Sequence, residues 1–155
     1  MSRINLGCGE DLLKDGVNVD LYNSKADLKH DLRLPLPFPD NSVDWMQALN
    51  IVEHFSRREW DVIRKDWYRV LKYGGYLWIK IPDFFACAKE FIRKRELGEW
   101  DSQKVMSIFG GQQDEGQFHK QGFDAKKISE SLEEVGFKVM KCVEKDFGID
   151  IEVTK

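Results

Sequence analysis

The sequence lacks several features that would assign it to particular protein classes. It has no apolar run long enough to span a bilayer and no signal peptide, so we expect a cytoplasmic protein with no membrane partner. Its three cysteines are odd in number and widely spaced, which argues against a disulfide framework, and no metal site is predicted. A net charge of −3 gives no electrostatic reason to expect nucleic acid as a partner.

Internal repeats and low-complexity linkers are also absent. The 155 residues, of which 42% are hydrophobic and 33% charged, suit one globular domain over residues 1–155. Strand-like and helix-like segments alternate along the chain, which predicts an α/β fold with a largely parallel sheet. Strands are expected over Arg3–Leu6, Gly16–Leu21, Ala26–Leu32, Val43–Leu49, Tyr76–Ile81, Phe137–Val143 and Ile149–Val153.

Helix boundary signals separate these strands. Ser56 and Glu59 have the spacing of a capping box, and the helix that they begin is expected to end at Gly74–Gly75. Further helices are expected over Phe84–Leu97 and over 124–136. Because no helix separates the last two strands, the last one is expected to run antiparallel to its neighbour.

A glycine turn follows the first strand, and an acid ends the second. Gly7 and Gly9 flank Cys8, and Asp20 follows eleven residues after Gly9. In a parallel sheet these positions lie at the carboxyl ends of the strands, where ligands bind, and together they outline a site for a nucleoside. A nicotinamide dinucleotide would require a third glycine, where this chain has Leu12, and an acid further along the chain, so that interpretation is disfavoured.

Five segments occur in an order typical of one enzyme family. They are INLGCG, NVDLY, HDLRLPLPFPDNSVDWMQALNIVEHF, WYRVLKYGGYLWIKIPD and FHKQGFDAKKISESLEEVGF. In these segments the chain resembles class I S-adenosylmethionine-dependent methyltransferases, in particular the small type 11 group, over nearly its whole length. The resemblance implies a Rossmann-like, mostly parallel seven-stranded sheet with an antiparallel last strand, in a minimal form without N-terminal helices. It also implies S-adenosyl-L-methionine as cofactor and S-adenosylhomocysteine as product.

The resemblance implies a set of cofactor-binding residues. Asp20 would bind the ribose, Asp31 the amino group of adenine, and Asn50 the methionine part or the acceptor. Simpler explanations are a tight turn for the glycines, a surface acid for Asp20, and turn residues for Asp31 and Asn50. Cys8 is interpreted as a small packing residue. The complete set is Asn5, Gly7, Cys8, Gly9, Asp20, Leu21, Asp31, Leu32 and Asn50.

The chain departs from the family pattern at several positions. Asn5 replaces an acid, Asp11 replaces a glycine and Tyr73 replaces a proline, while the helix after the glycine turn is expected to shrink to one turn over Glu10–Lys14. These departures suggest an alternative function, a cofactor-binding pseudo-enzyme or regulatory module without transfer activity.

Three residues are candidates for catalysis. His54 follows the fourth strand, where a neutral imidazole could take a proton from the acceptor, or it could simply flank a helix. Asp83 could orient or deprotonate the acceptor, or cap the next helix. The Gly- and Gln-rich segment Phe109–Phe123 is either a mobile lid that carries His119 to the site or a disordered surface loop. Trp100 and Phe109 are expected to line a pocket.

The acceptor is the least determined part of the prediction. Relatives with this segment pattern suggest a small polar molecule, such as a sugar or a cell-envelope precursor. The expected lack of N-terminal helices would leave apolar surface, so a homodimer is also predicted.

Overall fold

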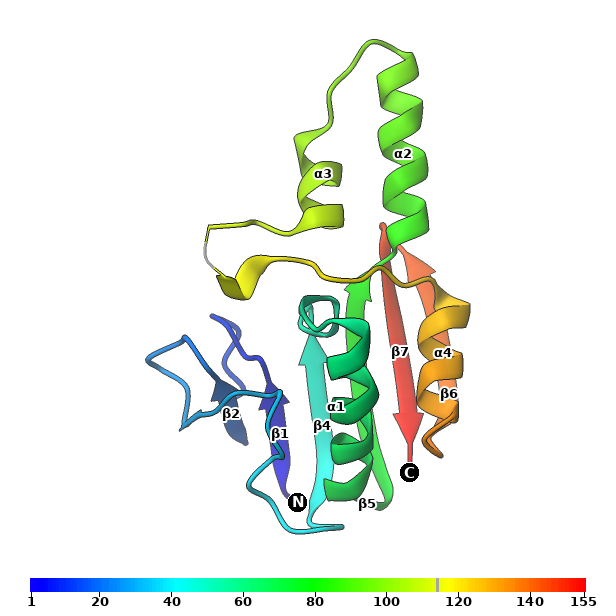
Figure 1. Ribbon diagram of the computed structural model, residues 1–155. Helices are drawn as coiled ribbons and strands as arrows, with labels where there is room; N and C mark the ends of the chain where they lie inside the picture. The colour runs from blue at the N-terminus through cyan, green and yellow to red at the C-terminus, as the bar shows by residue number, and fades with distance from the viewer. Residues whose placement is uncertain (114) are drawn as a thin grey trace.

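The computed structural model describes residues 1–113 and 115–155. Its strands form one seven-stranded sheet in the order β3-β2-β1-β4-β5-β7-β6 (Figure 1). The strands are β1 (Arg3–Leu6), β2 (Val17–Asp20), β3 (Leu28–Lys29), β4 (Val43–Leu49), β5 (Leu71–Pro82), β6 (Lys138–Lys145) and β7 (Gly148–Thr154).

The first five strands of the sheet are parallel to one another, and β7 lies antiparallel between β5 and β6. This confirms the Rossmann-like mostly parallel sheet and its antiparallel last strand. The strand order reverses between β1 and β4, which are adjacent although two strands separate them in the chain. In such sheets a crevice opens beyond the carboxyl ends of the two strands at the reversal.

Helices cover one face of the sheet and extend beyond one of its ends. In Figure 1, α1 and α4 lie against the same face, while α2 and α3 project beyond the carboxyl ends of the parallel strands. Within the described parts of the chain, no helix is long and apolar enough to cross a membrane. The helices are η1 (Val52–His54), α1 (Arg57–Val70), α2 (Phe84–Glu96), α3 (Ser102–Phe109), η2 (Glu115–Gln117) and α4 (Ala125–Glu133).

The start of α1 is as predicted, but its end is not. Ser56 and Glu59 form a capping box, in which each side chain accepts a hydrogen bond from the other residue's backbone N–H. The helix ends at Val70, before Gly74–Gly75, because fully buried Leu71 is already extended and pairs with Val43 of β4. Strand pairing and burial therefore override the glycine signal.

The expected helical turn over Glu10–Lys14 does not form. Side chains of neighbouring strands satisfy the backbone of this segment instead: Asn5 Nδ2 donates to the Asp11 carbonyl at 2.7 Å. Asn18 accepts from the Leu13 N–H at 2.7 Å and donates to its carbonyl at 2.9 Å. Helix α3 was not predicted, and β3 is shorter than the expected strand.

The two faces of the sheet differ in burial. The core contains alternate residues of the central strands, such as Leu77 and Ile79, packed with Trp67 of α1. The opposite face holds Trp45, which pairs with Tyr76, and Trp78; these rings are only partly buried.

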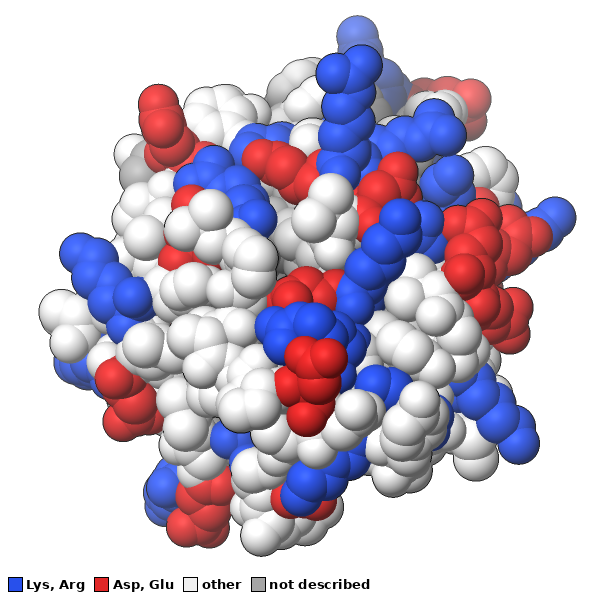
Figure 2. Space-filling view, turned by 60° about the horizontal axis from the view of Figure 1, so that its bottom comes forward, with Lys and Arg blue, Asp and Glu red and all other residues white. Residues whose placement is uncertain are grey.

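Charged side chains of both signs alternate on the lower side of the molecule. Figure 2 brings the bottom of Figure 1 forward and shows Lys and Arg interspersed with Asp and Glu. Arg69 pairs with Asp40 and Lys72 with Asp44, each at 2.8 Å. Opposite charges are therefore paired locally on this side.

Candidate functional site

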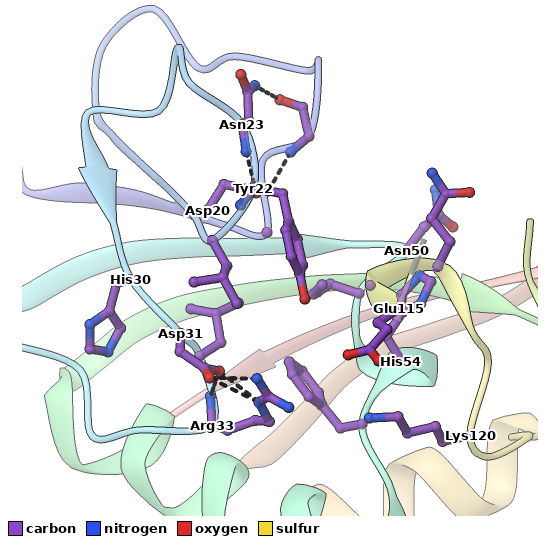
Figure 3. Close-up of a pocket in the computed structure, with 18 of the residues that line it drawn as sticks. Asp20, Tyr22, Asn23, His30, Asp31, Arg33, Asn50, His54, Glu115 and Lys120 are labelled. Carbon is purple, nitrogen blue, oxygen red and sulfur yellow. Dashed lines mark hydrogen bonds and ion pairs between the residues drawn. The ribbon is translucent and has the colours of Figure 1, made fainter. Parts of the chain in front are cut away.

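A pocket of about 430 Å³ opens beyond the carboxyl ends of β1, β2 and β4, at the reversal of the strand order (Figure 3). Its volume lies within the usual range for small-molecule sites. Most of the residues predicted for the cofactor line it: Gly7, Gly9, Asp20, Leu21, Asp31, Leu32 and Asn50.

The glycine turn brings backbone to the pocket wall. Gly7 and Gly9 both have positive φ, +65° and +47°, a conformation that side chains disfavour. A Cβ on Gly7 would lie 2.5 Å from Cγ1 of Ile51, whereas a Cβ on Gly9 would meet nothing within 4 Å. A ligand can therefore approach the Gly9 backbone closely.

Asp20 joins the glycine turn to the loop after β2. One carboxylate oxygen accepts from the Gly9 N–H at 2.9 Å. The other accepts from the N–H groups of Tyr22 and Asn23 at 2.7 and 2.9 Å. Since a carboxylate has about four acceptor positions, roughly one remains for a ligand.

Asp31 is paired within its own loop. The guanidinium of Arg33 donates to both Asp31 oxygens, at distances between 2.6 and 3.0 Å. These hydrogen bonds lower the pKa of Asp31, so its carboxylate is ionised at neutral pH. Leu32 beside it is buried and supplies an apolar wall.

Other side chains reach into the pocket from three loops. Figure 3 shows Tyr22 extending between Asp31 on one side and Asn50 on the other. Lys120 and Glu115 approach from a distant part of the chain. The pocket thus combines a nucleoside-sized wall of loops with several polar groups on the β4 side.

Four of the predicted site residues lie outside the pocket lining: Asn5, Cys8, Asp83 and His119. Asn5 is buried beneath the glycine turn. Cys8 is buried too, and burial is the main reason that the pKa of its thiol rises to about 11. Asp83 caps α2 by accepting from the Ala86 N–H at 2.9 Å, which is the structural role considered for it. Trp100 and Phe109, also expected in a pocket, are exposed and do not line it.

A second group of titratable residues lies beside the pocket. Glu53 in η1 is 3% exposed, and burial raises its pKa to about 8. His54 lines the pocket, and its ring packs edge-to-face on that of His119 with centroids 4.8 Å apart. Burial lowers the pKa of both imidazoles, which favours their neutral form. The structure therefore brings together two of the three predicted catalytic residues.

The segment that carries His119 folds onto η1. The Lys120 N–H donates to the Glu53 carbonyl at 2.8 Å, and Phe118 pairs with Gly110 in an isolated bridge. Glu115, Gly116 and Gln117 of this segment line the pocket. Asp114, part of the predicted lid, lies outside the described residues, and the lid stays a prediction.

Sequence reasoning missed several lining residues. Tyr22 and Arg33 each follow a predicted carboxylate by two residues, so a search of the neighbours of Asp20 and Asp31 would have found them. Lys120 has no local signal, because only the folding of its segment onto η1 brings it to the pocket.

A family model described as a methyltransferase domain matches residues 5–79. These residues contain the glycine turn, Asp20, Asp31 and Asn50. The search of curated proteins found no match.

Solved structures share the whole fold. The chain is similar to a SAM-dependent methyltransferase from Archaeoglobus fulgidus, with 16% identity and a TM-score of 0.67. The similarity covers 99% of this chain and 86% of that one. A SAM-dependent methyltransferase from Methanosarcina mazei is 20% identical over 99% of this chain and 92% of its own length, with a TM-score of 0.69. A structure from Thermotoga maritima is described as a SAM-dependent methyltransferase and possible histamine N-methyltransferase. It is 18% identical over 99% of this chain and 81% of its own length, with a TM-score of 0.66. At these identities the likenesses show the fold.

Proposed function

We propose that this chain is a class I S-adenosylmethionine-dependent methyltransferase and that it methylates a small polar acceptor such as a sugar or a cell-envelope precursor. One observation carries the proposal: the pocket at the strand reversal has a nucleoside-sized wall on the β2 side and polar groups on the β4 side. Bound S-adenosylmethionine supplies a methyl group that its sulfonium charge already activates. The chain's own task is then to hold acceptor and cofactor in line and away from water.

Within this proposal, the residues of the β2 side bind the nucleoside. The remaining acceptor position of Asp20 accepts a hydrogen bond from a ribose hydroxyl. The Asp31 carboxylate, which already accepts from Arg33, also accepts from the amino group of adenine beside Leu32. Open space at Gly9 admits the cofactor against the backbone. This assignment is supported by the position of Asp20, Asp31 and Leu32 on the same wall of the pocket.

The acceptor is placed on the β4 side. Four polar side chains approach this side of the pocket and offer hydrogen-bond donors and acceptors that suit the hydroxyl groups of a methyl acceptor: Asn50, His54, Glu115 and Lys120. Asp83 has no part in the proposed chemistry, because its carboxylate caps α2 outside the pocket. An amine is the competing acceptor class, since one structural neighbour is described as a possible histamine N-methyltransferase.

We also propose that the chain forms a homodimer through the sheet face that α1 and α4 leave uncovered. Trp45, Tyr76 and Trp78 are partly exposed side by side on that face, and aromatic side chains are enriched at interfaces. Light scattering at high protein concentration tests this proposal. A dimer mass is expected, and a monomer mass under the same conditions would contradict it.

Turnover of a panel of acceptors tests the proposed function. The chain is incubated with S-adenosylmethionine and either hydroxyl acceptors, including sugars, or small amines, and S-adenosylhomocysteine is measured by mass spectrometry. Product formation with a sugar hydroxyl supports the proposal, and product formation only with amines replaces the acceptor class. Cofactor binding without transfer to any acceptor would support the alternative, a pseudo-enzyme or regulatory module.

A further inference from the structure

The carboxyl group of Glu53 is deeply buried. Its side chain is 3% exposed, and neither oxygen is hydrogen-bonded by any part of the chain that the structure describes. Burying a carboxyl group without donors or a cation is costly, so such groups in folded proteins are normally paired or bind metals. The nearest ionisable partner is His119, whose Nε2 lies 4.0 Å from Glu53 Oε1.

The imidazoles of His54 and His119 lie beside this carboxyl group, and each has its Nδ1 close to a backbone carbonyl oxygen. His54 Nδ1 lies 3.2 Å from the carbonyl oxygen of Phe118, and His119 Nδ1 lies 3.0 Å from that of Ser107. A carbonyl oxygen only accepts hydrogen bonds, so each Nδ1 carries the hydrogen and each Nε2 keeps its lone pair. Metal-binding histidines are typically oriented in this way, with the second nitrogen bonded to a backbone carbonyl.

We propose that Glu53, His54 and His119 bind one divalent transition-metal ion of the Zn²⁺ class. One ligand atom from each residue lies within 4.8 Å of those of the other two. At a tetrahedral ion with metal–ligand distances of about 2.0–2.2 Å, ligand atoms lie about 3–3.5 Å apart, so binding draws the three side chains together by about 1 Å.

The ligand types select the class of ion. Two neutral nitrogens and one carboxylate suit Zn²⁺, Fe²⁺ or Co²⁺, whereas Mg²⁺ and Ca²⁺ favour oxygen ligands throughout. Three protein ligands also leave a coordination position open, as in catalytic rather than structural sites. His54 lines the pocket on the side of Asn50 and Lys120, so an open position there is available to a hydroxyl of the acceptor (Figure 3).

This inference changes the role predicted for the two histidines. A metal-bound Nε2 cannot accept a proton, so His54 and His119 act as ligands instead of as general bases. Metal binding is measured without cofactor or acceptor, and its result is therefore independent of the proposed function.

Metal titration of the chelator-treated, tag-free chain tests the proposal. We expect one tightly bound Zn²⁺ per chain, measured by elemental analysis after gel filtration, and a visible absorption spectrum with Co²⁺. Glu53→Gln and His119→Gln should each weaken Zn²⁺ binding by about 100-fold or more, since even changes next to metal ligands cost 10- to 100-fold. His30→Gln is the matched control, because His30 is the one histidine outside the cluster, and its Zn²⁺ affinity should be unchanged.

A measurement on the intact chain keeps the test valid if a variant fails to fold. Zn²⁺ should shift the NMR signals of two of the three imidazoles and leave the third, that of His30, in place. The proposal is overturned if the intact chain retains no Zn²⁺ or Co²⁺, if folded Glu53→Gln and His119→Gln bind as the unchanged chain does, or if His30 is the imidazole that responds.

Discussion

The carboxylate of Asp20 accepts a hydrogen bond from the backbone N–H of Gly9 at 2.9 Å, which ties the turn after β1 to the end of β2. The same carboxylate holds the N–H groups of Tyr22 and Asn23. Asp20 therefore organises both loops of the proposed nucleoside site before any ligand binds.

Replacing Asp20 should loosen the glycine turn. In Asp20→Ala the Gly9 N–H loses its acceptor, so its amide hydrogen should exchange with solvent at least 10-fold faster, measured by NMR hydrogen exchange. Buried amides of β4 and β5 serve as internal references and should keep their rates. Unchanged protection of Gly9 would show that the turn is held by other contacts.

The two glycines of the turn should differ in their tolerance of a side chain. Gly7→Ala combines a strained positive φ with a Cβ 2.5 Å from Ile51, so we expect a loss of about 3 kcal/mol in the free energy of unfolding. Gly9→Ala has the strain but open space around the Cβ, so a loss of about 1 kcal/mol is expected. Urea denaturation measures both values, and equal losses would contradict the packing described at Ile51.

The ion pair between Asp31 and Arg33 should show a defined pH dependence. Because Arg33 lowers the pKa of Asp31 in the folded chain, the pair stabilises the fold above the carboxyl's unfolded pKa and ceases to do so as the pH falls through the folded pKa. Both side chains are partly exposed, so the contribution at pH 7 should be under about 1 kcal/mol.

Arg33→Gln tests this pair directly. In an NMR titration the pKa of Asp31 should rise toward its ordinary range, and the small stability difference from the unchanged chain should vanish once the pH falls below the lowered pKa of Asp31 in the folded chain. An Asp31 pKa that does not move would mean that Arg33 is not the cause of the lowered value.

The cysteines should react slowly and in a definite order. Burial raises the pKa of the Cys8 thiol to about 11, so at pH 8 only about one thiol in a thousand is the reactive thiolate. Cys87 is fully buried, whereas Cys142 is partly exposed. Iodoacetamide labelling followed by peptide mass spectrometry should therefore modify Cys142 first, and denatured chain should react at all three. Rapid labelling of Cys8 in the folded chain would contradict its packing role.

The parts of the fold and site that could be predicted depend on short-range signals. The glycine turn, the acids at strand ends and the capping box at Ser56 each act within a few residues, and the structure places them as expected. The end of α1 could not be predicted in this way, because it depends on pairing of Leu71 with Val43 in another strand.

The group formed by Glu53, His54 and His119 shows the same limit. His119 is far from Glu53 in sequence, and the two meet only because the segment before α4 is hydrogen-bonded to η1. Asn5 was included in the predicted cofactor site, but the structure places it outside the pocket lining, where its Nδ2 donates to the Asp11 carbonyl and to Asn18 Oδ1. Side-chain direction and long-range contacts decide these cases, and neither is encoded in local spacing.

Calorimetric titration with S-adenosylhomocysteine tests the central claim most directly, with Asp20→Ala as the variant and NAD as the control ligand. The account predicts micromolar binding of S-adenosylhomocysteine to the intact chain, binding at least 10-fold weaker in Asp20→Ala, and no binding of NAD. Absence of S-adenosylhomocysteine binding to the folded, intact chain, or equal affinity in the folded variant, would contradict the assignment of the pocket.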